Sequence, residues 1–181
     1  MSLISKYLVF QDALSDWVGK SVAWLTLAMV GVLLWEIGAR YFVGVPTEWA
    51  HELTAMFYGT LCLVAGAYTL RHRGHVRSEV IYQMFSTRGK ARLDLVSHLL
   101  GLLVLVIFFV LAWEFAAKAW AIKETSNKGT WQPVVYPFKT VMPVAVGLMI
   151  LQSLAEILRD FCTAFGIEID DPREREQEPL I

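Results

Sequence analysis

Four long apolar stretches, separated by polar segments, dominate the sequence. A helix that rises about 1.5 Å per residue needs roughly 20 apolar residues to cross a hydrocarbon core about 30 Å thick. We predict membrane-spanning helices over residues 16–40, 49–70, 93–117 and 138–158. The third stretch is apolar on every face, as in helices surrounded by lipid or by other helices. The pattern therefore predicts an all-α integral membrane protein.

The segment before the first span has the spacing of an amphipathic helix. Apolar residues recur every three or four positions, and polar residues lie on the opposite side. The apolar set is Leu3, Tyr7, Phe10, Leu14 and Trp17, and the polar set is Ser5, Asp12 and Asp16. This pattern favours a short helix lying in the cytoplasmic membrane interface. The alternative is that the segment extends the first span.

The connection between the second and third spans is basic and also carries an apolar helical face. That face consists of Val76, Val80, Met84 and Phe85. A helix lying flat on an anionic leaflet has this pattern, because such a surface attracts nearby basic side chains. The alternative is that these charges only set the orientation of the spans.

The distribution of lysine and arginine predicts the orientation. With four spans, both termini and the connection between the second and third spans lie on one side of the membrane. That side holds eleven of the sixteen basic residues, and the other side holds five. The richer side is normally cytoplasmic, so we expect both termini in the cytoplasm. Because Asp12 and Asp16 precede the first span and no small-residue cleavage site follows it, we expect this span to stay in the mature protein.

Composition narrows the class of protein further. Apolar residues make up 56% of the chain and charged residues only 18%, with a mean hydropathy of +0.48. A soluble domain has about 25% charged residues, so a soluble globular enzyme is disfavoured. The net charge of −1 argues against a nucleic-acid partner. We expect one membrane domain over residues 1–166 and a polar, disordered tail over residues 167–181.

Candidate chemistry is sparse. No phosphate-binding, zinc-protease, CxxC or hydrolase motif is present, so we predict no catalytic residue, no metal site and no cofactor. Glu36 with Arg40, and Glu114 with Lys118, have the four-residue spacing of helical ion pairs. His98 is expected to hydrogen-bond a neighbouring helix.

The histidines and cysteines are the residues that could bind a haem or form a disulfide. His51 and His98 fall near opposite ends of their spans, about 25 Å apart in depth, and therefore cannot share a haem. A haem with a single histidine ligand stays open. Cys62 and Cys162 are expected to be buried free thiols.

The arrangement of four spans with both termini in the cytoplasm resembles the small membrane subunit of tripartite ATP-independent periplasmic (TRAP) transporters, the DctQ-like family. The resemblance covers about residues 15–160 and rests on an ordered set of weak signals. These are Arg40-Tyr41-Phe42, Trp49 and Glu52, Gly74-His75-Val76, and Pro143 with Leu151-Gln152. Glu79 stands where an aspartate is expected in the family.

The resemblance implies a scaffold subunit in the bacterial inner membrane. It would work with a large TRAP membrane subunit and a periplasmic substrate-binding protein to import an organic acid anion. The resemblance implies that an ion gradient, expected to be of sodium, drives the import. The competing hypothesis is a membrane anchor subunit of a redox complex, with or without haem.

Two groups of residues are candidates for contacts outside the chain. The candidate periplasmic docking surface comprises Arg40, Glu48, Glu52, Lys123, Glu124, Lys128 and Trp131. The alternative for any one of these residues is an ordinary solvated side chain. The candidate contacts with membrane phospholipids, through their head groups, are Arg71, Arg73, Arg77 and Arg88.

Overall fold

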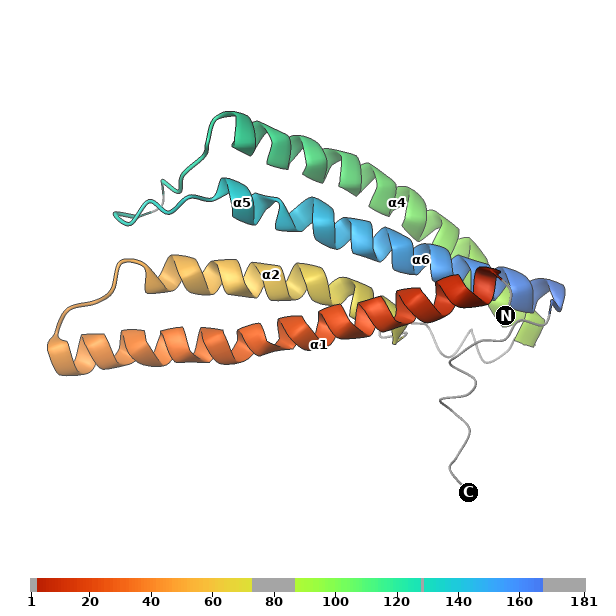
Figure 1. Cartoon of the computed structure of the whole chain (residues 1–181), viewed down its shortest axis with the longest axis horizontal. Coiled ribbons are helices and arrows are strands. Elements are labelled where there is room, and N and C mark those ends of the chain that lie inside the picture. The colour runs from red at the N-terminus through yellow and green to blue at the C-terminus, as the bar shows by residue number, and fades with distance from the viewer. Residues whose placement is uncertain (1–2, 73–86, 128, 168–181) are drawn as a thin grey trace, which may run out of the picture.

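The protein is a bundle of long helices (Figure 1). The computed structural model describes residues 3–72, 87–127 and 129–167. The elements are α1 (Leu3–Gly38), a π-helical turn η1 (Ala39–Val43), α2 (Ala50–Arg71), α4 (Thr87–Ala121), the short α5 (Tyr136–Lys139) and α6 (Val141–Phe165). Within these described ranges, four helices are long and apolar enough to cross a membrane: Ile4–Val43, Ala50–Arg71, Gly89–Ala121 and Tyr136–Phe165. The four predicted spans are therefore confirmed.

The helices form two antiparallel pairs. α1 packs on α2, α4 packs on α6, and α2 lies against α6 between the pairs. The pairs meet at one end of the bundle and separate towards the other (Figure 1). The described N-terminal end of α1 lies at the end where they meet, which we call the converging end. η1 lies at the opposite, splayed end (Figure 1).

The segment before the first span is part of α1 and not a separate interfacial helix. α1 runs without a break from Leu3 to Gly38, so the alternative of an extended first span is the one observed. Its polar side, which includes Ser5, Gln11 and Asp12, is buried inside the bundle. On the apolar side, Phe10 and Trp17 are exposed, whereas Tyr7 and Leu14 are half-buried, and the Tyr7 hydroxyl donates to the Leu151 carbonyl of α6. The amphipathic pattern thus arises because the polar face meets other helices, while the apolar face is partly exposed.

Small residues let the helices approach closely. Gly66 of α2 faces Met149 of α6, and a Cβ added at Gly66 would lie 2.8 Å from the Met149 sulfur. Gly19 of α1 lies directly against the Tyr68 ring of α2. Close approach through small residues is the usual packing mode of membrane helices.

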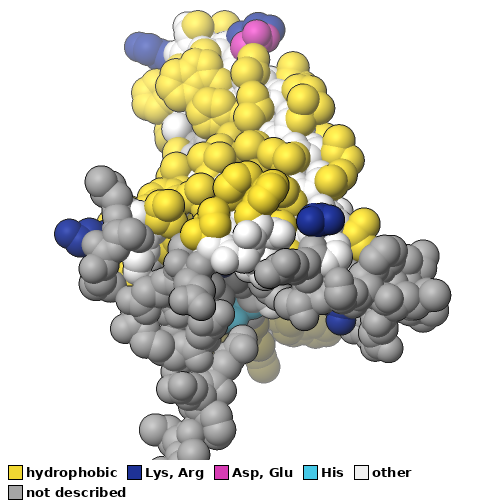
Figure 2. Space-filling view, turned by 90° about the vertical axis from the view of Figure 1, so that its right-hand side faces the viewer, with side chains coloured by type: hydrophobic (Ala, Val, Ile, Leu, Met, Phe, Trp, Pro, Cys, Tyr) yellow, Lys and Arg dark blue, Asp and Glu magenta, His cyan; other side chains and the backbone are white. Residues whose placement is uncertain are grey.

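The outer surface of the bundle is apolar. Hydrophobic side chains cover most of the described surface that is visible from the converging end (Figure 2). Exposed large hydrophobic residues follow α1 and α4 along almost their whole length. Cys162 is buried as expected, whereas Cys62 is exposed on this surface. The expectation that both thiols are buried is therefore wrong for Cys62.

Candidate docking surface and buried polar network

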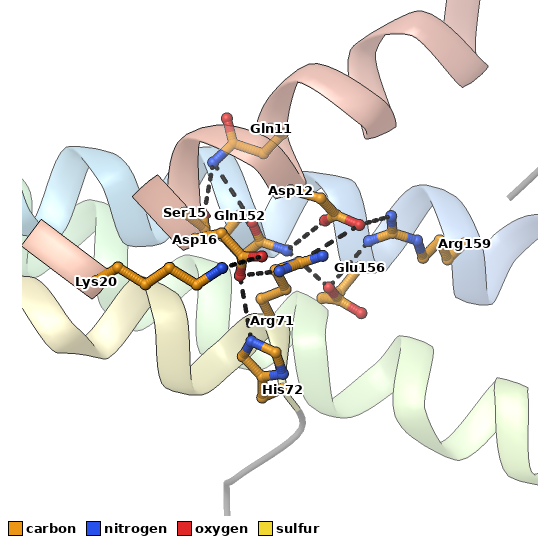
Figure 3. Close-up of polar contacts among 10 residues, drawn as sticks. All are labelled: Gln11, Asp12, Ser15, Asp16, Lys20, Arg71, His72, Gln152, Glu156 and Arg159. Carbon is orange, nitrogen blue, oxygen red and sulfur yellow. Dashed lines mark hydrogen bonds and ion pairs between the residues drawn. The ribbon is translucent and has the colours of Figure 1, made fainter. Parts of the chain in front are cut away.

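Three helices bring a set of polar side chains together at the converging end (Figure 3). We call this set the buried polar network. Its members are Gln11, Asp12, Ser15 and Asp16 of α1, Arg71 of α2, and Gln152, Glu156 and Arg159 of α6, with Lys20 of α1 and His72 after α2 exposed at its edge.

Arg159 is the central cation of the network. Its Nη2 lies 2.7 Å from Asp12 Oδ2, and its Nη1 lies 3.1 Å from Glu156 Oε1. These three side chains are only 4%, 5% and 2% exposed. A buried charge is tolerable only when it is paired and hydrogen-bonded, and both conditions are met here.

Gln152 connects the charged groups to the polar face of α1. Its amide nitrogen donates to Glu156 Oε1 at 2.9 Å and, more weakly, to Asp12 Oδ1 at 3.4 Å. Its amide oxygen accepts from Ser15 Oγ at 2.7 Å and from Gln11 Nε2 at 3.5 Å. The side chain is fully buried. Gln152 therefore forms hydrogen bonds with the polar face of α1, in place of the water that would otherwise form them.

Arg71 joins α2 to the same network. Its guanidinium forms an ion pair with Asp16, and its Nε lies 3.7 Å from Asp12 Oδ2. His72 Nε2 and Lys20 Nζ also lie near the Asp16 carboxylate, at 3.2 Å and 3.8 Å.

The structure corrects the expectation that Arg71 contacts lipid head groups. Its side chain is 6% exposed, because two carboxylates of α1 draw the guanidinium into the bundle. Arg73 and Arg77 lie outside the described residues. Arg88 lies in the first turn of α4, and its side chain is also outside the description. Lipid contact stays a prediction for these three residues.

His98 connects the other helix pair near the same end. Its Nδ1 lies 2.7 Å from Asp160 Oδ2, and both side chains are largely buried. The predicted role of His98 in linking helices is confirmed. In the described ranges, no group of three or more His, Cys, Asp or Glu side chains could hold a metal ion.

Sequence reasoning missed the network because it assigned Asp12 and Asp16 to a solvated face. A usable signal was present in the last span. Gln152, Glu156 and Arg159 recur at spacings of four and three in a helix whose preceding residues, 141–151, are all apolar. Such residues on one side of a membrane helix predict a polar contact with a neighbouring helix.

At the splayed end, one carboxylate organises the connection between α1 and α2. Glu36 Oε1 accepts from Arg40 Nη2 at 2.8 Å, so the predicted ion pair is confirmed. Glu36 Oε2 accepts from the backbone nitrogen of Thr47 at 2.9 Å and also from the Thr47 hydroxyl. Arg40 is thus held by its own helix, although its side chain stays mostly exposed. Glu48 is exposed.

The connection between α4 and α5 is an ordered loop held by Lys139. Lys139 Nζ lies 2.6 Å from both carboxylate oxygens of Glu124 and 4.1 Å from the centroid of the Phe115 ring. Thr125 and Val134 form an isolated antiparallel bridge across the loop. Glu124 therefore helps to position the loop, and its predicted docking role stays a prediction because its side chain is partly exposed.

The remaining docking candidates differ in exposure. Lys123 is exposed, and Trp131 is 40% exposed. Glu52 lies in the first turn of α2, and its Oε1 is buried without a hydrogen bond inside the described structure. Gly129 of the loop passes close to that oxygen, since a Cβ at this glycine would lie 2.8 Å away. Lys128 lies outside the described residues.

Comparison with known proteins identifies what this architecture is similar to. The family model described as "Tripartite ATP-independent periplasmic transporters, DctQ component" matches residues 29–163. The sialic acid TRAP transporter small permease protein SiaQ of Vibrio cholerae serotype O1 is 33% identical over 75 residues. That match spans 41% of this chain and 42% of the Vibrio protein, so it covers less than half of the length of the relative.

Proposed function

The chain belongs to the DctQ family of TRAP transporter components, and on that premise we propose that it is the fixed scaffold subunit of a secondary active importer. As a DctQ component it is a small, multi-pass transporter subunit and not an enzyme. In our proposal, a large membrane subunit packs against its apolar surface and carries the solute. A periplasmic binding protein delivers the solute to this pair.

One observation carries the scaffold role. The buried charges at the converging end are paired with one another, as Arg159 is with Asp12 and Glu156. A transport path needs polar groups that remain available to the solute or the coupling ion. A bundle that uses these groups for internal packing, and presents apolar faces outward, suits a supporting subunit.

We also propose the orientation and the docking side. The excess of lysine and arginine on the side of the termini favours a cytoplasmic converging end in the bacterial inner membrane. The splayed end then faces the periplasm. All seven residues of the candidate docking surface stay proposed contacts with the binding protein, and Arg40, Glu48, Lys123 and Trp131 are exposed among the described ones. The other three are Glu52, Glu124 and Lys128. Mixed charges and an aromatic side chain are typical of the rim and the anchors of protein interfaces.

The proposed cargo is an organic acid anion, with sodium as the proposed coupling ion. The name of the Vibrio relative specifies sialic acid, which carries a carboxylate. The choice of anion would lie in the large subunit and the binding protein. We further propose phospholipid head groups near Arg73, Arg77 and Arg88, between this chain and the large subunit. The redox-anchor hypothesis gains no support from the family match.

Reconstitution tests the proposal directly. Proteoliposomes would contain the large subunit with or without this chain, and uptake of a labelled organic acid anion would be measured with the binding protein outside. We expect uptake only when both membrane subunits are present. Uptake by this chain alone, or undiminished uptake without it, would contradict the scaffold role.

A further inference from the structure

The outer end of α1 carries an exposed apolar cluster that the transport function does not explain. Tyr41, Phe42, Val43 and Val45 are 80%, 91%, 72% and 63% exposed. We call these four residues the α1 tip. In Figure 1, this end of the chain projects past the residue at which α2 begins and past the outer ends of α4 and α6. No other helix in the described part of the bundle covers it.

The α1 tip has a defined shape and is not a frayed helix end. η1 continues α1 for another turn, and Gly44 ends it in the left-handed conformation with φ +75°. The Glu36 carboxylate fixes the backbone on both sides of the tip. It accepts hydrogen bonds from Arg40, which precedes the tip, and from Thr47, which follows it. The exposed aromatic rings are therefore presented on an ordered backbone.

The apolar surface of the tip is continuous with the membrane surface of the helix. Exposed Leu27, Leu34 and Trp35 lead along α1 towards the tip. The charged side chains in between, Glu36 and Arg40, neutralise each other as a pair. A patch built to bind a soluble protein would be separated from the lipid surface by a polar rim, and this one is not.

The length of α1 indicates where the tip lies. The first candidate span covers 40 residues, which corresponds to about 60 Å of helix at about 1.5 Å per residue. At a tilt of about 40°, the upper end of the usual range, its height is about 46 Å, close to the roughly 40–45 Å of a bilayer with its head groups. A tilted α1 therefore reaches from one head-group layer to the other.

We propose that the α1 tip is a membrane anchor, with Tyr41 and Phe42 inserted in the head-group layer of the outer leaflet. Aromatic side chains are enriched at this depth because they combine an apolar body with favourable interfacial contacts. The anchor fixes the tilt of α1 and sets the height of the neighbouring loops above the membrane. This inference needs only a membrane-spanning α1 and does not depend on the proposed transport role.

Site-directed spin labelling tests the anchor in the complete complex. In a Cys62→Ala, Cys162→Ala background, nitroxides would be placed by Phe42→Cys and, as a second reporter, Tyr41→Cys. Val104→Cys on the exposed face of α4 is the lipid control, and Asn127→Cys in the exposed loop is the water control. Variants would be accepted only when they elute as the parent complex does.

The measurement is the ratio of nitroxide collisions with oxygen, which concentrates in lipid, to collisions with a water-soluble nickel chelate. We expect the two tip labels to show a ratio at least about threefold above that at residue 127 and below that at residue 104, with or without the large subunit. A ratio equal to that at residue 127 would overturn the proposal. Shielding from both reagents only in the presence of another subunit would also overturn it, in favour of a protein contact.

Discussion

Asp12 accepts a 2.7 Å hydrogen bond from Arg159, which lies 147 positions later in the chain. Both side chains are almost completely buried. The pair joins the first helix to the last and therefore contributes to the fold only when the whole bundle is assembled.

Replacing Arg159 by methionine should strongly destabilise the protein. The change leaves Asp12 and Glu156 buried without their cation, and loss of one partner of a buried ion pair costs about 3–5 kcal/mol. Thermal unfolding in detergent would measure the loss. The control is Lys118→Met, because Lys118 and Glu114 are 80% and 60% exposed and 3.9 Å apart. That control should change the free energy of unfolding by less than about 0.5 kcal/mol.

A double substitution separates the pair from the general effect of losing a charge. Asp12→Asn combined with Arg159→Met should restore part of the stability, because the uncompensated carboxylate is removed together with its partner. Strictly additive losses in the double variant would show that the two side chains are not coupled.

Gln152→Leu should destabilise the bundle without changing its charge. Leucine has a similar volume but can neither donate to Glu156 nor accept from Ser15. Each buried polar group left unsatisfied costs about 1–3 kcal/mol. Leu151→Met, at a neighbouring exposed position, is the matched control for the unfolding measurement. Equal melting temperatures for the two variants would be inconsistent with the network as described.

Two glycine substitutions should have opposite effects. Gly66→Leu would push against Met149 and separate α2 from α6, and overpacking of this kind costs about 1–3 kcal/mol. A Cβ at Gly101 would meet nothing within 4 Å. Gly101→Ala should therefore raise the stability of α4 by roughly 0.5–1 kcal/mol through helix propensity. The melting temperatures of the two variants, compared with the parent, give the sign of each effect.

Lys139→Met should loosen the loop between α4 and α5. Methionine keeps apolar contact with Phe115 but removes the ion pair with Glu124, whose side chain is partly exposed. Loss of this ion pair should destabilise the closed loop by about 1 kcal/mol, which corresponds to a roughly fivefold higher population of the open loop. Limited proteolysis at Lys123 should accelerate by that factor. Lys118→Met serves again as the control, and an unchanged cleavage rate would argue against a positioning role for Lys139.

Lys123→Glu should weaken docking without harming the fold. If the exposed Lys123 contributes to the interface, reversal of its charge should raise the binding-protein concentration for half-maximal uptake by roughly two- to tenfold, as rim charges do. Lys6→Glu, an exposed lysine at the converging end, should leave that concentration unchanged. Identical uptake curves for both variants would remove Lys123 from the proposed docking surface.

The spans were predictable because their signal is local. About 20 consecutive apolar residues identify a crossing helix whatever its neighbours are. The Glu36–Arg40 pair was predictable for the same reason, since both residues lie on one helix four positions apart. The role of His98 in linking helices was predictable because it is a polar residue within a span. The identity of its partner, Asp160, was not predictable in this way.

The inward face of α1 could not be predicted from its own periodicity. A polar stripe containing Asp12 and Asp16 looks the same whether it meets water or another helix. The difference depends on Arg71 and Arg159, which are distant in the sequence. The ion pair of Glu124 could not be predicted either, because its partner Lys139 lies on the far side of a loop.

The pairing of Asp12 with Arg159 also has a consequence for biosynthesis. A ribosome adds about 5–20 residues per second, so the 147 positions between the two residues take roughly 7–30 s to translate. During that interval Asp16 can already pair with Arg71, but Asp12 still lacks the guanidinium of Arg159, which is its closest cation in the finished bundle. A truncated product that ends before the last helix keeps this defect permanently, which gives cellular proteases a physical basis for distinguishing it from the finished polypeptide.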